Sequence, residues 1–448
     1  MAGSRSSRCT DPAGAVGAFL LEHVEPGDRI CVGLSGGLDS AVLLDLLVRQ
    51  RSRFGYHLNA VHVNHQLSPH AGEWARFCGA LCEAAGVPLS IRLVEVADGD
   101  EGLEAAARRA RYAAFAEADA DALALAHQRD DQAETVLLNL LRGGGILGAA
   151  AMPAERALGG HRRALRVLRP LLGVSRQDIL AYALARGLRW VEDESNADTR
   201  LARNFLRRDI VPLLERRFPG CSEALARSAG LAADAAGLLD DLARIDLDAG
   251  AGCADGLSVA VLRSLTPARA ANLLRYWLRG LDVGVPTAAR LAEILRQITE
   301  ARADAAVAVR VGAHVVRRFR GCAVVTRHRP PEPGAPCRWT GEALLPWGNS
   351  AIRFTAAPGA GISADALARA EVTIRPRGGG ETLRLHPARP RRSLKQLFQE
   401  AGVPPWERPG LPVLWSGTDV VWVPGVGIAA EYRCGAGEMG WSVSWQRD

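Results

Sequence analysis

Residues 29–47, RICVGLSGGLDSAVLLDLL, constrain the fold of this 448-residue chain more than any other stretch. Ile30, Cys31 and Val32 form a short apolar run that predicts a buried strand. Apolar residues then recur at helical spacing, so we expect a helix here with Ser40 as its N-cap. Two adjacent glycines between the strand and the helix can turn backbone amides toward one point. The stretch therefore predicts an anion-binding loop at a helix N-terminus.

The loop has the pattern S-G-G-x-D-S, which resembles the phosphate loop of the ATP pyrophosphatases. Its residues are Ser35, Gly36, Gly37, Leu38, Asp39 and Ser40. That superfamily cleaves ATP to AMP and pyrophosphate, so the resemblance implies ATP as the cofactor. A phosphate cradle alone needs no acid, and the Asp39 carboxylate can hold Mg²⁺. The pattern is not a Walker A loop, because no Gly-Lys-Ser/Thr follows. The alternative is a tight turn with a capping serine.

The N-terminal part of the chain alternates strand-like and helical patterns. Strand-like runs cover residues 30–32, 56–63, 89–94 and 122–126, with helical patterns between them. This alternation predicts an α/β fold with a doubly wound parallel sheet. Ligands of such sheets bind at the carboxyl ends of the strands. The loop and the segments that follow residues 63 and 126 should therefore share one crevice.

Two polar groups are candidates for that crevice. His127 follows a strand, and Asp131 and Glu134 stand three residues apart in the first turn of the next helix. Helix capping alone can explain these acids, but with the histidine they can also hold Mg²⁺ or orient a nucleophile. Arg108 and Arg111 lie on one face of an earlier helix, where a solvated basic face is the alternative.

The rest of the chain divides, by pattern, into a helical part and a small α+β part. We expect the catalytic domain over residues 1–218, a helical domain over 219–329 and a third domain over 338–448, after a proline-rich linker. The third domain carries a basic patch: Arg375, Arg377, Arg384, Arg389, Arg391, Arg392 and Lys395. Basic residues beside tryptophans favour an RNA surface over a merely solvated face.

Composition sets the class of protein. There are 55 basic and 49 acidic residues, and Lys395 is the only lysine. Arginine suits phosphate contacts, although its abundance is also typical of a GC-rich genome. The nine cysteines include no C-x-x-C pair, and we expect free thiols in a reducing cytoplasm. No signal peptide and no membrane-spanning run are expected. The sequence leaves the oligomeric state open.

The loop and several later motifs together resemble one family, the tRNA(Ile)-lysidine synthases. The shared motifs are AVHVNHQL from Ala60, LEAAARRARYAAF from Leu103, LALAHQRDDQAETVLLNLLRGGG from Leu123, RPLL from Arg169, WVEDESNAD from Trp190, RNFLRR from Arg203 and RRSLKQLFQEAGVPPWERPGLPVLW from Arg391. The chain departs from the family at Glu194, where a proline is usual, and at residues 148–152, where Gly-Leu-x-Gly-Met is usual.

The resemblance implies a reaction and its partners. Free L-lysine is joined to C2 of the wobble cytidine in the CAU anticodon of tRNA(Ile), after ATP adenylates the C2 oxygen. By this resemblance Arg108 and Arg111 would stabilise charge during adenylation. His127, Asp131 and Glu134 would shape the lysine and nucleotide site, where the acids attract the ε-ammonium.

The resemblance also assigns the residues that meet the tRNA. Arg203 and Arg207 would face the reacting nucleotide, and the two C-terminal domains would read the tRNA body and acceptor stem. Three rival functions remain at this point. A cytidine thiolase of the same superfamily would need paired C-x-x-C cysteines, and a small-molecule amidotransferase would need a glutaminase. A catalytically silent tRNA-binding protein would not need the intact loop.

Overall fold

The computed structural model describes residues 10–66, 68–96, 103–158, 165–192, 194, 198–250, 253, 256–284, 286–302, 305–328 and 334–446. The described residues form two compact units, which divide between Leu239 and Asp240. Part of the predicted proline-rich linker lies outside the described residues, as do three residues of the Asp-Glu-Ser-Asn motif: Asp193, Ser195 and Asn196. The predicted division into three domains stays a prediction.

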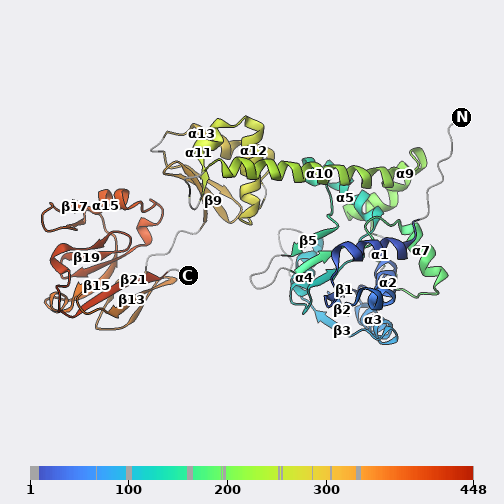
Figure 1. The fold of residues 1–448 in the computed structure, drawn as a ribbon, viewed down its shortest axis with the longest axis horizontal. Coiled ribbons are helices and arrows are strands. Elements are labelled where there is room, and N and C mark those ends of the chain that lie inside the picture. The colour runs from blue at the N-terminus through green and yellow to red at the C-terminus, as the bar shows by residue number, and fades with distance from the viewer. Residues whose placement is uncertain are drawn as a thin grey trace. The chain divides into compact units, whose positions relative to one another are not determined.

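The first unit is built on one sheet with the strand order β3-β2-β1-β4-β6-β5 (Figure 1). All neighbours are parallel except β5 and β6. The strands are β1 (Arg29–Gly33), β2 (His57–Asn64), β3 (Leu89–Leu93), β4 (Ala122–Ala124), β5 (Glu155–Leu158) and β6 (Leu165–Leu168). This is the predicted doubly wound α/β sheet, and the strand order reverses between β1 and β4, where ligands of such sheets bind.

The helices of this unit follow the predicted alternation. They are α1 (Pro12–His23), α2 (Leu38–Phe54), α3 (Ala71–Ala85), α4 (Leu103–Ala116), α5 (Arg129–Leu141), α6 (Gly145–Ala149), α7 (Arg176–Ala185), α8 (Ala202–Phe205), the π-helical turn η2 (Leu206–Ile210) and α9 (Val211–Arg217). The core explains the position of the loop, because α2 buries Val42, Leu43 and Leu47 against β1, whose Ile30 and Val32 are fully buried. Burial of this apolar face fixes the start of α2 at the end of β1.

Two local predictions in this unit are wrong. Ser40 is not the N-cap of α2, because the helix begins at Leu38 and Gly37 occupies the cap position without a side-chain hydrogen bond. The second concerns the stretch before Met152, whose glycines predict a loop: it contains the short helix α6. Gly144 stays close to Asn139, whose side chain donates a hydrogen bond to the Gly148 carbonyl over 2.9 Å and holds α6 in place.

The second part of the chain combines helices with antiparallel sheets. After α10 (Cys221–Asp248), the helices α11 (Val259–Ser264), α12 (Pro267–Gly280) and α13 (Ala288–Glu300) pack with a sheet of order β7-β10-β9-β8. Its strands are β7 (Leu257–Ser258), β8 (Ala308–Val311), β9 (His314–Phe319) and β10 (Cys322–Arg327). Residues 307–325, whose apolar runs predict a hairpin, thus form part of a larger sheet. Among the described residues, no helix is long and apolar enough to cross a membrane.

The C-terminal residues form the predicted α+β structure. Its main sheet has the order β11-β15-β18-β19-β20, and a second sheet has the order β12-β13-β21-β14. The strands are β11 (Cys337–Arg338), β12 (Leu344–Trp347), β13 (Ser350–Ala356), β14 (Ile362–Ser363), β15 (Val372–Pro376), β18 (Pro412–Ser416), β19 (Asp419–Val423), β20 (Gly427–Ile428) and β21 (Gly440–Gln446). The short pair β16 (Thr382–Leu383) and β17 (Arg392–Ser393) precedes α15 (Leu394–Ala401), and α14 (Ala364–Leu367) follows β14.

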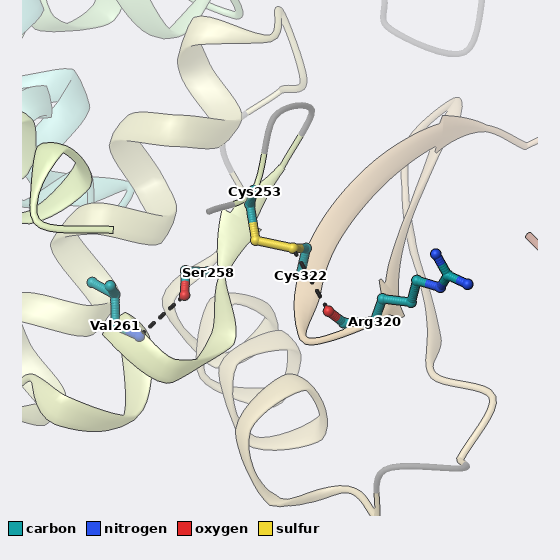
Figure 2. The surroundings of a disulfide bond; sticks show 5 residues. All are labelled: Cys253, Ser258, Val261, Arg320 and Cys322. Carbon is teal, nitrogen blue, oxygen red and sulfur yellow. Dashed lines mark hydrogen bonds between the residues drawn. A yellow bond between two sulfur atoms is a disulfide. The ribbon is translucent and has the colours of Figure 1, made fainter. Parts of the chain in front are cut away.

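A disulfide joins Cys253 to Cys322 (Figure 2). The prediction of free thiols is therefore wrong for these two cysteines. The pairing was hidden in the sequence because it depends on β7, which forms an antiparallel pair with β10 and places Ser258 opposite Cys322. Six further cysteines among the described residues are free.

We expect reduction of this disulfide to destabilise the unit formed by residues 240–448. The bond closes a loop with a sequence separation of 69, so its loss is expected to lower the free energy of unfolding by about 2–4 kcal/mol. Thermal melts with and without dithiothreitol measure the change. A Cys253→Ser variant should melt identically in both buffers, whereas Cys434→Ser, which removes a free cysteine, should keep the difference. Equal melts of the unsubstituted protein in both buffers would contradict the prediction.

Candidate active site

The glycine-rich loop joins β1 to α2 and is shaped by the close approach of another segment. Gly36 has φ = +87°, which favours glycine. A Cβ atom there would lie 3.0 Å from Cγ2 of Val191 and 3.1 Å from Sγ of Cys78. The Val191 amide also donates a hydrogen bond to the Gly36 carbonyl over 3.0 Å. Any side chain at this position would therefore push the loop out of its cradle shape.

The two serines of the loop face each other. Their Oγ atoms lie 3.1 Å apart, and Ser40 Oγ also accepts a hydrogen bond from the Gly36 amide over 3.2 Å and donates one to the Gly37 carbonyl over 2.9 Å. The Gly37 amide donates to Ser35 Oγ over 3.3 Å. The first amides of α2 have no partner within the helix, as at any helix start. Hydroxyls and amides thus gather at the start of a helix, an arrangement suited to an anion, and the anion site itself stays a prediction.

Asp39 lies in the first turn of α2 and is incompletely paired. Its Oδ2 lies 3.4 Å from Nη1 of Arg176, whereas its Oδ1 is buried without a hydrogen-bond partner. Burial raises the pKa of Asp39 to about 6, which Arg176 opposes. A buried carboxylate oxygen without a partner, beside a phosphate cradle, fits the donor set of Mg²⁺, which takes one or two carboxylates together with phosphate and water oxygens.

Helix α5 presents its first turn to the same region. The Gln128 amide donates a hydrogen bond to Asp131 Oδ2 over 3.1 Å, so Asp131 does cap the helix. Its other oxygen, Oδ1, accepts a hydrogen bond from Nη2 of Arg207 over 2.7 Å. Asp131 therefore caps the helix and pairs with Arg207 at the same time, and its role in the site chemistry stays a prediction.

Glu134 forms the most buried ion pair of the site. Its side chain is 2% exposed, and its two oxygens accept hydrogen bonds from Nε and Nη2 of Arg207 over 2.6 and 3.0 Å. Burial raises the pKa of Glu134, and the Arg207 guanidinium opposes that effect. Arg207 lies in the π-helical turn η2, a distortion that often marks functional positions. Arg203, one turn earlier, donates a hydrogen bond to Thr135 Oγ1 over 2.8 Å.

His127 stands between the acids and a group of arginines. Its Nδ1 is buried without a hydrogen-bond partner. Burial lowers its pKa to about 3, and the charges of Arg169, Arg108, Arg111 and Arg203 act in the same direction. The imidazole is therefore neutral at physiological pH and offers a hydrogen bond, not a positive charge.

The structure thus brings the predicted residues into one region. Asp39 is within electrostatic reach of Asp131 and Arg207, and His127 is within reach of Arg108, Arg111 and Arg203. Sequence reasoning missed two residues of this region, Asp130 and Arg176. The backbone amide of Arg176 donates a hydrogen bond to Asp130 Oδ2 over 3.0 Å. A pocket of about 270 Å³ also lies beside Val191, lined by His70, Glu73, Trp74, Val191, Glu192 and Glu194.

The C-terminal basic patch is partly neutralised by nearby acids. Arg392 forms a two-pronged pair with Glu400, and Arg384 lies 2.7 Å from Glu431. Arg391 is 3.6 Å from the same glutamate. Arg389 and Lys395 are exposed and form no ion pair with any residue that the structure describes. The exposed free charge of the patch therefore lies in these two side chains, because Arg375, which also forms no ion pair with a described residue, is half-buried and lies over the Trp415 ring.

Models of known families match three segments of the chain. A PP-loop domain covers residues 15–214. A TilS substrate binding domain covers residues 257–324, and a TilS substrate C-terminal domain covers residues 372–445. The first match contains every residue of the candidate active site.

Curated relatives extend over nearly the whole chain. A tRNA(Ile)-lysidine synthase from Azoarcus sp. (strain BH72) is 45% identical over 430 residues, which cover 94% of this chain and 92% of the relative. A tRNA(Ile)-lysidine synthase from Aromatoleum aromaticum is 46% identical, over 96% of this chain and all of the relative. The chain belongs to the tRNA(Ile)-lysidine synthase family. It is accordingly an ATP-dependent ligase with a PP-loop domain, and the rival functions are set aside.

Solved structures give weaker likenesses. The U34-tRNA thiolase NcsA from Methanococcus maripaludis matches 49% of this chain and 77% of its own, with 20% identity and a TM-score of 0.41. A crystal structure of a TILS C-terminal domain matches 25% of this chain and 97% of its own, with 23% identity and a TM-score of 0.21.

Proposed function

We propose that the protein joins free L-lysine to C2 of the wobble cytidine of tRNA(Ile) with a CAU anticodon, in the cytoplasm and in two steps. The C2 oxygen first attacks the α-phosphorus of ATP, and pyrophosphate leaves. The lysine ε-amine then attacks C2, loses a proton, and AMP leaves with the oxygen. Adenylation is needed because an amide-like oxygen is a poor leaving group, whereas AMP is a good one. Family membership and the PP-loop geometry support this reaction.

The loop from Ser35 to Ser40 is proposed to hold the phosphates of ATP. The unpartnered Asp39 Oδ1 is the single observation that most favours a metal here, and this carboxylate would bind Mg²⁺. When bound, the ion would neutralise charge on the departing pyrophosphate. Arg108 and Arg111, on α4, would stabilise the negative charge that develops during adenylation.

Free lysine is proposed to bind near the start of α5. Asp131 and Glu134 are the carboxylates that would attract its ε-ammonium, with the neutral His127 beside them. Both acids are paired with Arg207 in this structure. Lysine would therefore compete with Arg207 for them, and the released guanidinium, together with Arg203, could turn to the reacting nucleotide.

Incorporation of labelled lysine into unmodified tRNA(Ile) tests the function directly. The reaction needs ATP, and the methionine tRNA with the same CAU anticodon is the control. We expect label in the isoleucine tRNA alone. Pyrophosphate release without label in either tRNA would reject lysine ligation while keeping the ATP site.

The exposed charges of the basic patch give a second test, of tRNA binding. Removing Arg389 and Lys395 together, as alanines, is expected to weaken binding and to reduce the slope of log K against log[salt] by about 2, because each phosphate contact releases counterions. Binding of the tRNA is measured over a series of salt concentrations. Arg392→Ala is the matched control, because Glu400 already neutralises that charge. An unchanged slope in the double variant would remove the patch from the tRNA interface.

A further inference from the structure

Several arginines surround Tyr112 near the carboxyl end of β6, and two of them have no role in the reaction described above. The Cζ atoms of Arg156 and Arg108 lie 4.9 and 5.1 Å from the centroid of the Tyr112 ring. Arg169, the first residue after β6, lies close enough to act on the hydroxyl of Tyr112: burial alone would raise the pKa of Tyr112, but the charges of Arg108, Arg156 and Arg169 lower it. We call Tyr112, Arg108, Arg156 and Arg169 the Tyr112 cluster.

The positive charge of this cluster is uncompensated. Arg169 is 2% exposed and uses Nη1 to donate a hydrogen bond to the Pro153 carbonyl over 2.6 Å. The Nε atoms of Arg156 and Arg169 are buried without hydrogen-bond partners, and the buried hydroxyl of Tyr112 lies beside the Arg169 guanidinium. Among the described residues, no carboxylate forms an ion pair with Arg108, Arg156 or Arg169. A buried guanidinium without an anion is strongly unfavourable, so the arrangement is suited to an anion that arrives from outside.

The cluster lies at the same edge of the sheet as the phosphate loop. Val32 of β1 pairs with Ala124 of β4, which pairs with Leu168 of β6, so the three strands end side by side. The loop follows the first of these strands, His127 the second and Arg169 the third. Burial and then the charge of Arg169 are the main causes that lower the pKa of His127, as expected for close neighbours.

We propose that the Tyr112 cluster is a second phosphate-binding subsite, which holds a nucleotide phosphate through Arg169, Arg156 and the Tyr112 hydroxyl. This inference rests on the proposed function. Guanidinium groups bind phosphate oxygens through paired N–H donors, and the phenol supplies a further donor. Arg207 cannot serve in this way while the two acids of α5 hold it. The phosphate belongs either to ATP or to the tRNA backbone beside the target cytidine.

Stability provides the first measurement, because it separates a binding role from a structural one. Arg169→Met keeps an unbranched apolar stem and removes the uncompensated charge, so we expect a higher melting temperature for the ligand-free protein. A structural arginine would give the opposite result, because its hydrogen bond to Pro153 would be lost. If Arg169→Met does not fold, the same comparison of melting temperatures is made with Arg156→Gln and Tyr112→Phe, which are at less buried positions.

Binding identifies the source of the phosphate. Affinities are measured for α,β-methylene-ATP with Mg²⁺ and for a tRNA(Ile) transcript, the latter over a salt series. We expect Arg169→Met and Arg156→Gln to weaken one of them by about 10- to 100-fold. Weaker nucleotide binding alone assigns the phosphate to ATP. Weaker tRNA binding with a salt slope lower by about 1 assigns it to the tRNA backbone. Arg109→Gln is the control, because Arg109 is an exposed arginine on α4, the helix that carries Tyr112. This variant should change neither the nucleotide affinity nor the tRNA affinity.

The outcomes separate this subsite from the proposed function. The subsite is overturned if Arg156→Gln and Tyr112→Phe leave both affinities unchanged and Arg169→Met lowers the melting temperature. The Tyr112 cluster would then be purely structural. If the unsubstituted protein ligates no lysine but its affinity for the nucleotide or the tRNA still depends on Arg169, the proposed function fails and the subsite stands.

Discussion

Asp39→Asn is expected to reduce the formation of AMP and pyrophosphate from ATP by about 10²–10³-fold or more, while tRNA binding is unchanged. The substitution keeps the shape of the side chain and removes the charge that would bind Mg²⁺, and a metal contact of this kind contributes several kcal/mol to phosphate chemistry. Pyrophosphate release and tRNA affinity are measured on the same preparation. Asp45→Asn, in the same helix but away from the loop, is the control. A variant that loses tRNA binding as well would contradict this role for Asp39.

The pH dependence of the same step follows from the raised pKa of Asp39. Below about pH 6 the carboxyl is protonated and cannot bind a cation, so the rate of pyrophosphate release should fall as the pH drops through that value. Metal binding favours the ionised form, so more Mg²⁺ should move the midpoint to lower pH. Asp39→Asn should lack this limb of the profile. A midpoint that does not respond to Mg²⁺ would separate Asp39 from the metal.

The sequence predicted the sheet and the loop because both depend on local patterns. The strands around Ile30 and Leu123 belong to a pattern that repeats at regular spacing. The loop from Ser35 to Ser40 is one short motif, so periodicity and motif suffice to place both. The start of α2 was misplaced by three residues, because Ser40 is a good N-cap by type, whereas Gly37 holds the cap position. Its hydroxyl instead bonds to the backbone of the loop, which only the folded turn reveals.

The pairing of charges could not be read from the chain. Arg207 and Glu134 are 73 residues apart and meet only because η2 turns that arginine toward α5. The Tyr112 cluster was missed for a similar reason. Arg156 lies in the edge strand β5 and Arg169 directly follows β6, and no strong alternation of residues predicted these two strands. Nothing in the sequence shows which of many arginines lack an acidic partner.

The contact between Glu134 and Arg207 gives the second large prediction. Arg207→Met leaves Glu134 as a buried carboxylate without its main partner. Breaking a buried pair lowers the free energy of unfolding by about 3–5 kcal/mol, and the partial exposure of Arg207 favours the lower end. For a unit of this size that corresponds to a fall in melting temperature of about 6–12 °C.

A double variant separates stability from function. Glu134→Met with Arg207→Met removes both charges and fills similar volume, which is often neutral for stability. Its melting temperature should therefore return close to that of the unsubstituted protein. Lysine incorporation should be absent in the double variant, because the carboxylate that would attract the ε-ammonium is gone. Calorimetry and labelled lysine give the two readouts. If activity returned with stability, the pair would be a structural link, and the lysine site would have to be sought elsewhere in the crevice.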